Sequence, residues 1–385
     1  MPLIAAGTAV LGGEVCRPGW LQVTGSRIHA CGSGPPPALP DVDLPDAIVV
    51  PGFVDMHVHG GAGAAYSDAD GVERAASFHG RHGTTGGLAS LVTAAPEALL
   101  DQVRVLAEAT RHGVVDGIHL EGPWLSGQHC GAHDPAWLRD PAAGEIDALL
   151  GVGGGALRMV TLAPELPGGL DAVRRFIDAG VVVAIGHTDA TYAQVQAAIE
   201  AGASVGTHLF NAMRPLHQRE PGPVLALLED PRVTVELIAD GVHVHPALIR
   251  HVVDTAGPDR VALVTDAITA AGAGDGAFRL GGLDVDVAAG VARVRGTTTI
   301  AGSTATMDRL LATAVTLLGA AGQGHDGALP TAVRLTSTTP ARALGLEHAG
   351  DLRPGFDANL VVLDSDLQVL RVMRRGGWLA DGGGA

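Results

Sequence analysis

Short apolar segments alternate with longer segments of helical periodicity between residues 48 and 268, and this alternation limits the fold more than any other feature of the sequence. Helix-like segments such as DAVRRFIDAG and TYAQVQAAIEAG end in the Gly that is typical just beyond a helix C-terminus. Strands that are apolar on both faces and separated by helices indicate a parallel sheet, and eight of them predict a TIM-type (β/α)₈ barrel. The eight candidate strands are IVVPGFVDMHVH, TTGGLASLVT, VVDGIHLEG, ALRMVTLAPE, VVVAIGHTD, SVGTHLFNA, VTVELIADG and VALVTDAI.

Both ends of the chain have a different pattern, in which short strands are separated by turns rich in Gly and Pro. Because chain termini usually lie close together, we expect residues 1–48 and 346–385 to form one small β-sandwich domain, with residues 49–345 as the barrel. Within the barrel, FRLGGLDVDVAAGVARVR predicts a hairpin and ATMDRLLATAVTLLGAAG predicts a helix. The long polar connection WLSGQHCGAHDPAWLRD predicts a lid.

Composition excludes several classes of protein. Hydrophobic residues make up 46% of the 385 residues and charged residues 17%, unlike a disordered chain. The net charge of −16 argues against a nucleic-acid partner. No apolar run reaches the ~18 residues of a membrane span, and no basic segment precedes the apolar N-terminus as in a signal peptide. Three cysteines without a C-x-x-C pair favour a reducing compartment, so we expect a cytoplasmic protein without a membrane partner.

Histidines and carboxylates stand at the C-terminal ends of five predicted strands, where barrel enzymes place their active sites. Imidazole and carboxylate ligands suit Zn²⁺ or Fe²⁺ with one position open to water. His119 fits a packed residue near the site better than a ligand. Six further histidines are predicted to be surface or structural residues: His79, His82, His112, His251, His325 and His348. The residues predicted at the strand ends are His57, His59, Glu121, His187, His208 and Asp266.

Longer motifs carry a resemblance to a known family. The opening PGFVDMHVHG, the strand-end order His-x-His, Glu, His, His, Asp and the closing PGFDANLVVLD resemble the amidohydrolase superfamily. Within it, the stretch from about residue 48 to residue 365 is similar to the N-acetylglucosamine-6-phosphate deacetylases. The motifs that carry this similarity are HLEGPWLSGQHCGAHDP, GHTDAT, THLFNAMRPLHQREPG, ADGVHVHP, LVTDAITAAG and AGSTATMD.

The resemblance implies a metal centre at the mouth of the barrel. Glu121, His187 and His208 match the ligands of the family's principal metal. His57 and His59 match the pair that holds a second metal in some members, so the resemblance allows one or two divalent ions. Glu121 would then bridge the two metals, where many amidohydrolases use a carboxylated lysine.

The resemblance also implies the substrate and the remaining site residues. The expected reaction is hydrolysis of the acetamide of N-acetylglucosamine 6-phosphate to glucosamine 6-phosphate and acetate, in amino-sugar catabolism or cell-wall recycling. Asp266 matches the general base, and His133 in the lid matches the residue that contacts the substrate carbonyl. Asn211, Ala212, Arg219 and His243 match contacts to the sugar phosphate, and Arg219 would reach across from a neighbouring subunit of a homodimer.

Three other functions stay open at this point. The same chemistry on N-acetylgalactosamine 6-phosphate is the nearest alternative. A cyclic-amide hydrolase such as a dihydroorotase typically carries a lysine ligand on the fourth strand, and ALRMVTLAPE contains none. A non-catalytic barrel scaffold would be favoured by loss of a ligand or of the base, and all are present. Cys130 lies three residues before His133, and we expect an inert loop thiol there rather than a redox sensor or a metal contact.

Overall fold

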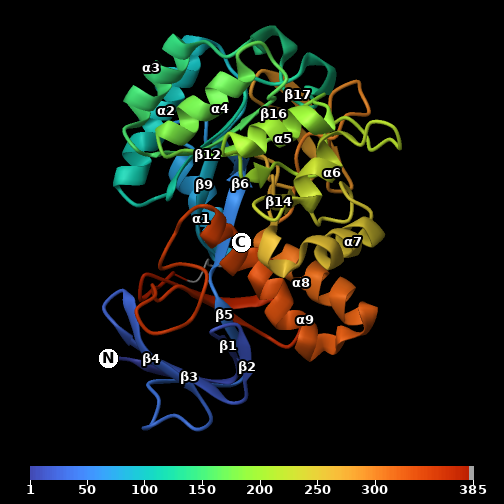
Figure 1. The fold of residues 1–385 in the computed structure, drawn as a ribbon. Coiled ribbons are helices and arrows are strands. Elements are labelled where there is room, and N and C mark those ends of the chain that lie inside the picture. The colour runs from blue at the N-terminus through green and yellow to red at the C-terminus, as the bar shows by residue number, and fades with distance from the viewer. Residues whose placement is uncertain (381–385) are drawn as a thin grey trace. The chain divides into compact units, whose positions relative to one another are not determined.

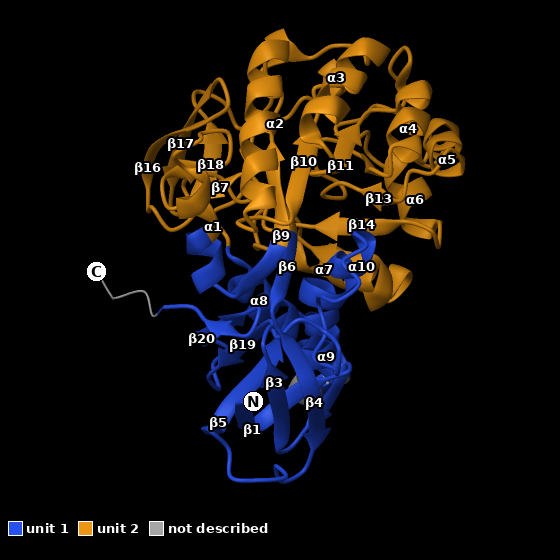
Figure 2. Ribbon diagram, turned by 90° about the vertical axis from the view of Figure 1, so that its left-hand side faces the viewer, with its two compact units in different colours: residues 1–55, 77–86, 306–385 blue, residues 56–76, 87–305 orange. Residues whose placement is uncertain are grey.

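The computed structural model describes residues 1–380, apart from the side chains of Gln323, His325 and Asp326. The prediction for His325 therefore lies outside the described residues. The chain divides into two compact units: unit 1 contains residues 1–55, 77–86 and those from 306 onward, and unit 2 contains residues 56–76 and 87–305 (Figure 2). Since the units interleave along the sequence, the boundaries proposed after residues 48 and 345 remain a prediction.

Eight parallel strands form the sheet that carries the predicted site, in the order β15-β14-β13-β12-β11-β10-β9-β6. Four of them, β6, β9, β12 and β14, are labelled in Figure 1. Each of the eight predicted segments contains one of these eight strands, so the barrel prediction is confirmed. At the mouth the first and last strands meet, because Asp266 N–H donates to His57 O and His59 N–H donates to Ala267 O, both at 2.8 Å. The strands are β6 (Phe53–Val58), β9 (Thr84–Leu91), β10 (Gly117–Glu121), β11 (Leu157–Leu162), β12 (Val182–Ile185), β13 (Val205–Gly206), β14 (Thr234–Leu237) and β15 (Val261–Leu263).

Amphipathic helices connect these strands. Four of them, α2, α4, α6 and α7, contact β10, β12, β14 and β15 respectively. Gly180 and Gly202 follow α4 and α5 with φ of 75° and 113°, as their place after each helix-like segment predicts. The first seven helices are α1 (Val72–Arg81), α2 (Pro96–Arg111), α3 (Ala143–Gly153), α4 (Gly169–Asp178), α5 (Tyr192–Glu200), α6 (Gly222–Glu229) and α7 (Pro246–Ala256).

A capping box begins α5. The Thr191 hydroxyl accepts a hydrogen bond from the main-chain N–H of Gln194, and the side-chain Oε1 of Gln194 accepts one from the main-chain N–H of Thr191. Thr191→Ala removes one half of this box and should lower the free energy of unfolding by about 1 kcal/mol. Urea denaturation measures the loss, and Thr191→Ser, which keeps the hydroxyl, serves as the control. An alanine variant as stable as the serine variant would contradict the role of the cap.

Strands from both ends of the chain form one mixed sheet in unit 1, in the order β21-β20-β19-β5-β1-β3-β4, with β2 paired to β1. β5 pairs with β1 in parallel and with β19 in antiparallel orientation, which joins the N-terminal strands to the C-terminal ones. Ile4, Leu21, Val49 and Leu360 are all fully buried in its core. The expectation that both termini form one β-structure is therefore confirmed, as a single mixed sheet, whereas the bounds of that domain stay a prediction. Its strands are β1 (Leu3–Leu11), β2 (Glu14–Cys16), β3 (Gly19–Thr24), β4 (Arg27–Ser33), β5 (Val42–Pro51), β19 (Leu360–Leu363), β20 (Val369–Arg374) and β21 (Gly377–Trp378).

The predicted hairpin after β15 is a three-stranded antiparallel sheet in unit 2, formed by β16 (Gly276–Leu280), β17 (Leu283–Ala288) and β18 (Val291–Val294). The predicted helix that follows is α8 (Met307–Leu318), and α9 (Gly324–Val333) and α10 (Thr339–Ala343) come after it in unit 1. Short strands β7 (Gly60–Gly61) and β8 (Ala64–Ala65) pair just beyond β6. No helix among residues 1–380 is both long and apolar enough to cross a membrane.

Candidate active site

The predicted strand-end residues lie at or just beyond the C-terminal ends of their strands, and each is at most 8% exposed. Three of them, His187, His208 and Asp266, have a positive φ of 48°, 26° and 47°. Left-handed backbone is uncommon for residues other than glycine, and such strain is concentrated at functional sites. At these positions the chain leaves its strand and presents the side chain to the barrel mouth.

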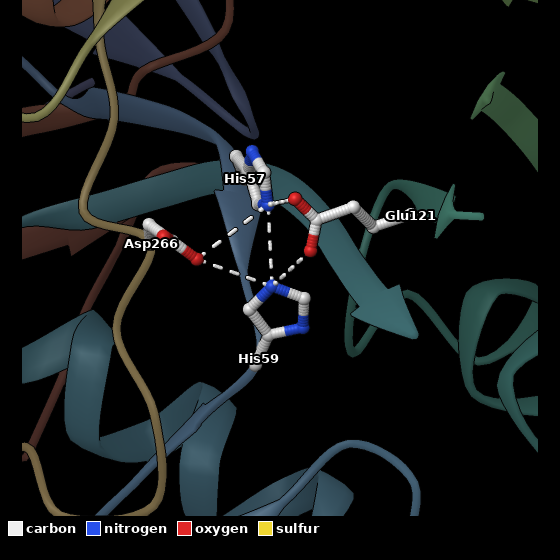
Figure 3. Close-up of side chains that lie close together, drawn as sticks. All are labelled: His57, His59, Glu121 and Asp266. Atoms are coloured by element: carbon white, nitrogen blue, oxygen red, sulfur yellow. Dashed lines mark hydrogen bonds and ion pairs between the residues drawn. The ribbon is translucent and has the colours of Figure 1, made fainter. Parts of the chain in front are cut away.

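The carboxylate of Glu121 lies at the centre of the group. Its Oε1 is 2.9 Å from His208 Nε2 and 3.1 Å from His187 Nε2, and these two nitrogens are 3.1 Å apart. On the other side, Glu121 Oε2 is 3.2 Å from His59 Nε2, which lies 3.2 Å from His57 Nε2 (Figure 3). His57 Nε2 also lies 3.4 Å from Glu121 Oε1, so the one carboxylate contacts both pairs of histidines, as a bridging ligand would.

Hydrogen bonds to the outer ring nitrogens orient two of these histidines. His187 Nδ1 donates to the main-chain carbonyl of His129 at 2.8 Å, and His57 Nδ1 donates to the Glu236 carboxylate at 3.1 Å. In a neutral ring these bonds leave the Nε2 lone pair directed toward Glu121. Metal-ligating histidines are held in this way by an acceptor on the other ring nitrogen.

The charges around His57 and His59 favour a cation. Burial alone lowers the pKa of His57, but Glu121, Glu236 and Asp266 raise it well above its usual value. Burial likewise lowers the pKa of His59, yet the bonds to Asp266 and Glu121 raise it to about 9. The same carboxylates that favour protons on these two rings would also favour a divalent cation there, whose binding would release those protons. The donor set of nitrogen and oxygen atoms thus fits a divalent metal.

His133 approaches the same group but is oriented differently. Its Nε2 lies 3.2 Å from Glu121 Oε2, while its Nδ1 accepts a hydrogen bond from Thr93 N–H at 3.2 Å. Burial lowers the pKa of His133 to about 4, so the ring is neutral at pH 7 and its proton is on Nε2. His133 is therefore arranged as a hydrogen-bond donor rather than as a ligand.

Asp266 faces the His57 and His59 side of the group. Its Oδ1 lies 3.2 Å from His59 Nε2 and 3.5 Å from His57 Nε2 (Figure 3). Burial raises the pKa of Asp266, but His57 and His59 outweigh burial and lower it to about 2. The main chain of Asp266 is fixed as well, since Ser303 N–H donates to its carbonyl at 2.8 Å. An ionised, anchored carboxylate can accept a proton.

A cavity of about 400 Å³ opens onto this group. Asn211, Ala212 and His243, predicted to contact the sugar phosphate, line it together with the strand-end residues other than His57. His243 Nδ1 donates to Asp240 Oδ2 at 2.8 Å, which directs Nε2 away from that carboxylate. Arg219 is exposed and does not line the cavity, and the described lining contains no arginine. The chain has no lysine at all.

Several predicted histidines and Cys130 lie apart from the cavity. His119 donates and accepts within a buried network with Ser90 Oγ and Thr161 Oγ1, at 2.9 and 2.8 Å, and packs edge-on against His57. Cys130 is partly buried and is not part of the lining, and none of the three cysteines, all within residues 1–380, forms a disulfide. The five described histidines predicted to be surface or structural residues are also outside the lining: His79, His82, His112, His251 and His348.

Sequence reasoning missed three residues that hold the site in place: Thr93, His129 and Glu236. His129 acts through its main-chain carbonyl, for which the sequence offers no signal. Thr93 acts through its main-chain N–H and through its hydroxyl, which lies 2.9 Å from His133 Nδ1. Glu236 had a signal, because it is an acidic residue inside the apolar segment VTVELIADG. A charged side chain in such a segment is buried only when it is paired.

Comparisons with known proteins agree with this geometry. A model of the amidohydrolase family matches residues 48–379. An N-acetylglucosamine-6-phosphate deacetylase of Danio rerio is 39% identical over 344 residues, which cover 85% of this chain and 83% of the relative. An N-acetylgalactosamine-6-phosphate deacetylase of Escherichia coli O157:H7 is 38% identical over 337 residues, or 86% of this chain and 87% of the relative.

A solved structure extends the likeness over almost the whole chain. It is an alanine mutant of the Mycobacterium smegmatis N-acetyl-D-glucosamine-6-phosphate deacetylase in complex with N-acetyl-D-glucosamine 6-phosphate. It is 56% identical to this chain, covers 99% of both chains and has a TM-score of 0.96. The family model matches most of this chain, and the strand-end residues gather around Glu121. This chain therefore belongs to the amidohydrolase family.

Proposed function

We propose that this protein hydrolyses the acetamide of N-acetyl-D-glucosamine 6-phosphate, giving D-glucosamine 6-phosphate and acetate. The observation that carries the proposal is that Asp266 and His133 both contact the Glu121 group and line one cavity with it. A proton acceptor, a hydrogen-bond donor and a metal-binding group are the parts that amide hydrolysis requires. The names of the relatives in the comparisons support the same substrate.

We infer that the cofactor is a divalent metal, Zn²⁺ or Fe²⁺, with one or two ions per chain. Glu121, His187 and His208 would hold the first ion, since both histidines contact the same carboxylate oxygen. His57 and His59, together with Glu121, would hold the second. Such an ion supplies an activated water and a Lewis acid for the amide carbonyl.

Asp266 would act as general base and then as general acid. Its carboxylate is ionised at neutral pH and lies at the cavity surface, so it can take a proton from the attacking water. The same proton can then pass to the leaving nitrogen, because an amine leaves poorly unless it is protonated. His133 Nε2–H would donate to the amide oxygen, and this bond strengthens as negative charge develops there.

The phosphate favours a guanidinium partner, and the described lining of the cavity contains no arginine. We propose that Arg219 of a second subunit contacts the phosphate, while His243 and Asn211 contact the sugar and Ala212 lies beside it. The exposure of Arg219 and the absence of arginine from the described lining support a homodimer in which the site is completed across the interface. A guanidinium binds phosphate through two parallel hydrogen bonds.

The metal content of the purified protein tests the ligand assignment. We expect one to two divalent ions per chain by elemental analysis. If the wild type holds two, the double variant His57→Ala/His59→Ala should hold about one, because only Glu121, His187 and His208 would remain as ligands. His112→Ala, which changes an exposed histidine outside the cavity, should leave the count unchanged. Fully active protein with less than one ion per chain would contradict the assignment.

Acetate release tests the function and its nearest alternative together. We expect rapid turnover of N-acetylglucosamine 6-phosphate, slower turnover of N-acetylgalactosamine 6-phosphate and little turnover of unphosphorylated N-acetylglucosamine. Because one relative is named for the galactosamine substrate, both epimers belong in the assay. A higher kcat/KM for the galactosamine epimer would replace the proposed substrate, and the absence of acetate from both would refute the proposed function.

Two other functions lose support. A cyclic-amide hydrolase of the dihydroorotase type needs a lysine ligand, and the chain contains no lysine. A non-catalytic scaffold does not account for a buried base and donor that face one cavity. We also propose a cytoplasmic location, which the unpaired state of all three cysteines supports.

A further inference from the structure

Glu236 lies in the middle of β14, a strand that contains no metal-ligand candidate, and its side chain is 0% exposed. Its Oε2 accepts two hydrogen bonds at 3.1 Å, one from His57 Nδ1 and one from the main-chain N–H of His208. The carbonyl of Glu236 accepts a third, from Leu209 N–H at 2.8 Å. One carboxylate oxygen on β14 thus contacts His57 in β6 and His208 just after β13.

The second carboxylate oxygen argues against a role in stability alone. Glu236 Oε1 is buried and has no hydrogen-bond partner among the described residues. A buried carboxylate with an unpaired oxygen is expensive, and a well-packed apolar residue of similar volume is often neutral or stabilising in its place. A carboxylate at this position therefore lowers the stability of the fold, and this cost points to a function for the two hydrogen bonds that Glu236 Oε2 accepts.

Each contact fixes one predicted ligand. The bond to His57 Nδ1 leaves the Nε2 lone pair toward Glu121 and Asp266, 3.4 and 3.5 Å away. The bond to His208 N–H holds the main chain where His208 has a φ of 26°, next to its own contact with Glu121. His57 belongs to the proposed second metal position and His208 to the first.

We propose that Glu236 is a positioning residue that holds one ligand of each metal position and sets the metal affinity of the centre, most of all at the His57 and His59 position. The inference rests on the proposed metal-dependent function and deepens it. His57 depends on Glu236 for its ring orientation, whereas Glu236 contacts only the main chain of His208. Loss of Glu236 should therefore weaken the second position more than the first.

The test is Zn²⁺ binding to metal-free, full-length protein in competition with a chromophoric chelator. Glu236→Leu removes the oxygen that accepts both hydrogen bonds. It should lower the affinity for the more weakly bound Zn²⁺ by about 10- to 100-fold, the range seen when a metal-ligating residue loses its hydrogen-bond partner. Glu236→Gln keeps a carbonyl oxygen that can accept from His57 Nδ1–H, and it should recover part of the affinity. Recovery by Gln separates hydrogen bonding from packing.

Val235→Ala is the matched control. Val235 is the neighbouring residue on the same strand, is fully buried and faces the opposite side, so its truncation destabilises the same element without reaching a ligand. It should lower Tm and leave Zn²⁺ affinity unchanged. Wild-type affinity in Glu236→Leu, or an equal loss in Val235→Ala, would overturn the role of Glu236. Failure of the wild type itself to bind Zn²⁺ would instead refute the metal-dependent function.

Discussion

Asp266→Asn should lower kcat by at least about 10²-fold while leaving the fold and the metal content intact. Asparagine has nearly the same shape as aspartate but cannot accept the proton of the attacking water. The main-chain bonds that place residue 266, to His57 O and from Ser303 N–H, do not involve the side chain and should persist. Steady-state kinetics with N-acetylglucosamine 6-phosphate, together with elemental analysis, measures both parts of this expectation.

The same substitution at Asp308 provides a matched control. Asp308 is also largely buried, accepts from His82 Nδ1 at 3.0 Å and does not line the cavity. Asp308→Asn should therefore change stability more than kcat. Near-normal kcat in Asp266→Asn would exclude Asp266 as the base, and loss of metal from that variant would show that it acts as a ligand instead.

Arg219→Ala should lower kcat/KM for N-acetylglucosamine 6-phosphate by orders of magnitude and scarcely alter the slow turnover of the unphosphorylated sugar. A charge-assisted hydrogen bond contributes about 1.5–3 kcal/mol, so each lost bond to the phosphate should cost about 10- to 150-fold. Part of the loss should appear in kcat, because binding energy from a remote group can orient the reacting amide. Arg232→Ala, at an exposed arginine paired with Asp230 and Glu200, is the control and should change neither constant.

Mixed dimers test whether Arg219 acts across an interface. When Arg219→Ala chains exchange subunits with Asp266→Asn chains, a mixed dimer contains one site with a working base and the partner's arginine. Random exchange at equal concentrations makes about a quarter of all sites complete. Activity should therefore rise above that of either variant alone. No rise under verified exchange would place Arg219 in the site of its own subunit, and equal losses on both sugars would refute the phosphate contact.

Much of the barrel could be predicted from the sequence because its signals are local. Apolar runs predict where the strands lie, and glycines predict where α4 and α5 end. Parallel strands in a barrel have their C-terminal ends at one rim. The placement of Glu121, His187 and Asp266 at that rim follows from strand order alone. The extent of β13 does not, since this strand spans only Val205–Gly206 before His208 turns into left-handed backbone.

The remaining features depend on contacts between distant parts of the chain. The carboxylate of Glu236 meets His57 across 179 sequence positions, and no periodicity specifies that pairing. The tautomer of His133 depends on the main-chain N–H and the hydroxyl of Thr93, which lies 40 positions away in the sequence. The parallel pairing of β1 with β5 likewise requires the register of two strands that are separated in the sequence by three others, β2, β3 and β4.

The absence of lysine from the chain has a consequence for how the metal centre is assembled. A bridging carbamate forms only when carbon dioxide adds to an uncharged lysine amine, so such a centre depends on dissolved bicarbonate and decomposes in acid. Here the central carboxylate belongs to Glu121 and is built in during translation. If Glu121 bridges the proposed metal ions, we therefore expect metal loading to need no carbon dioxide, so that buffers purged of bicarbonate support it as well as air-equilibrated ones.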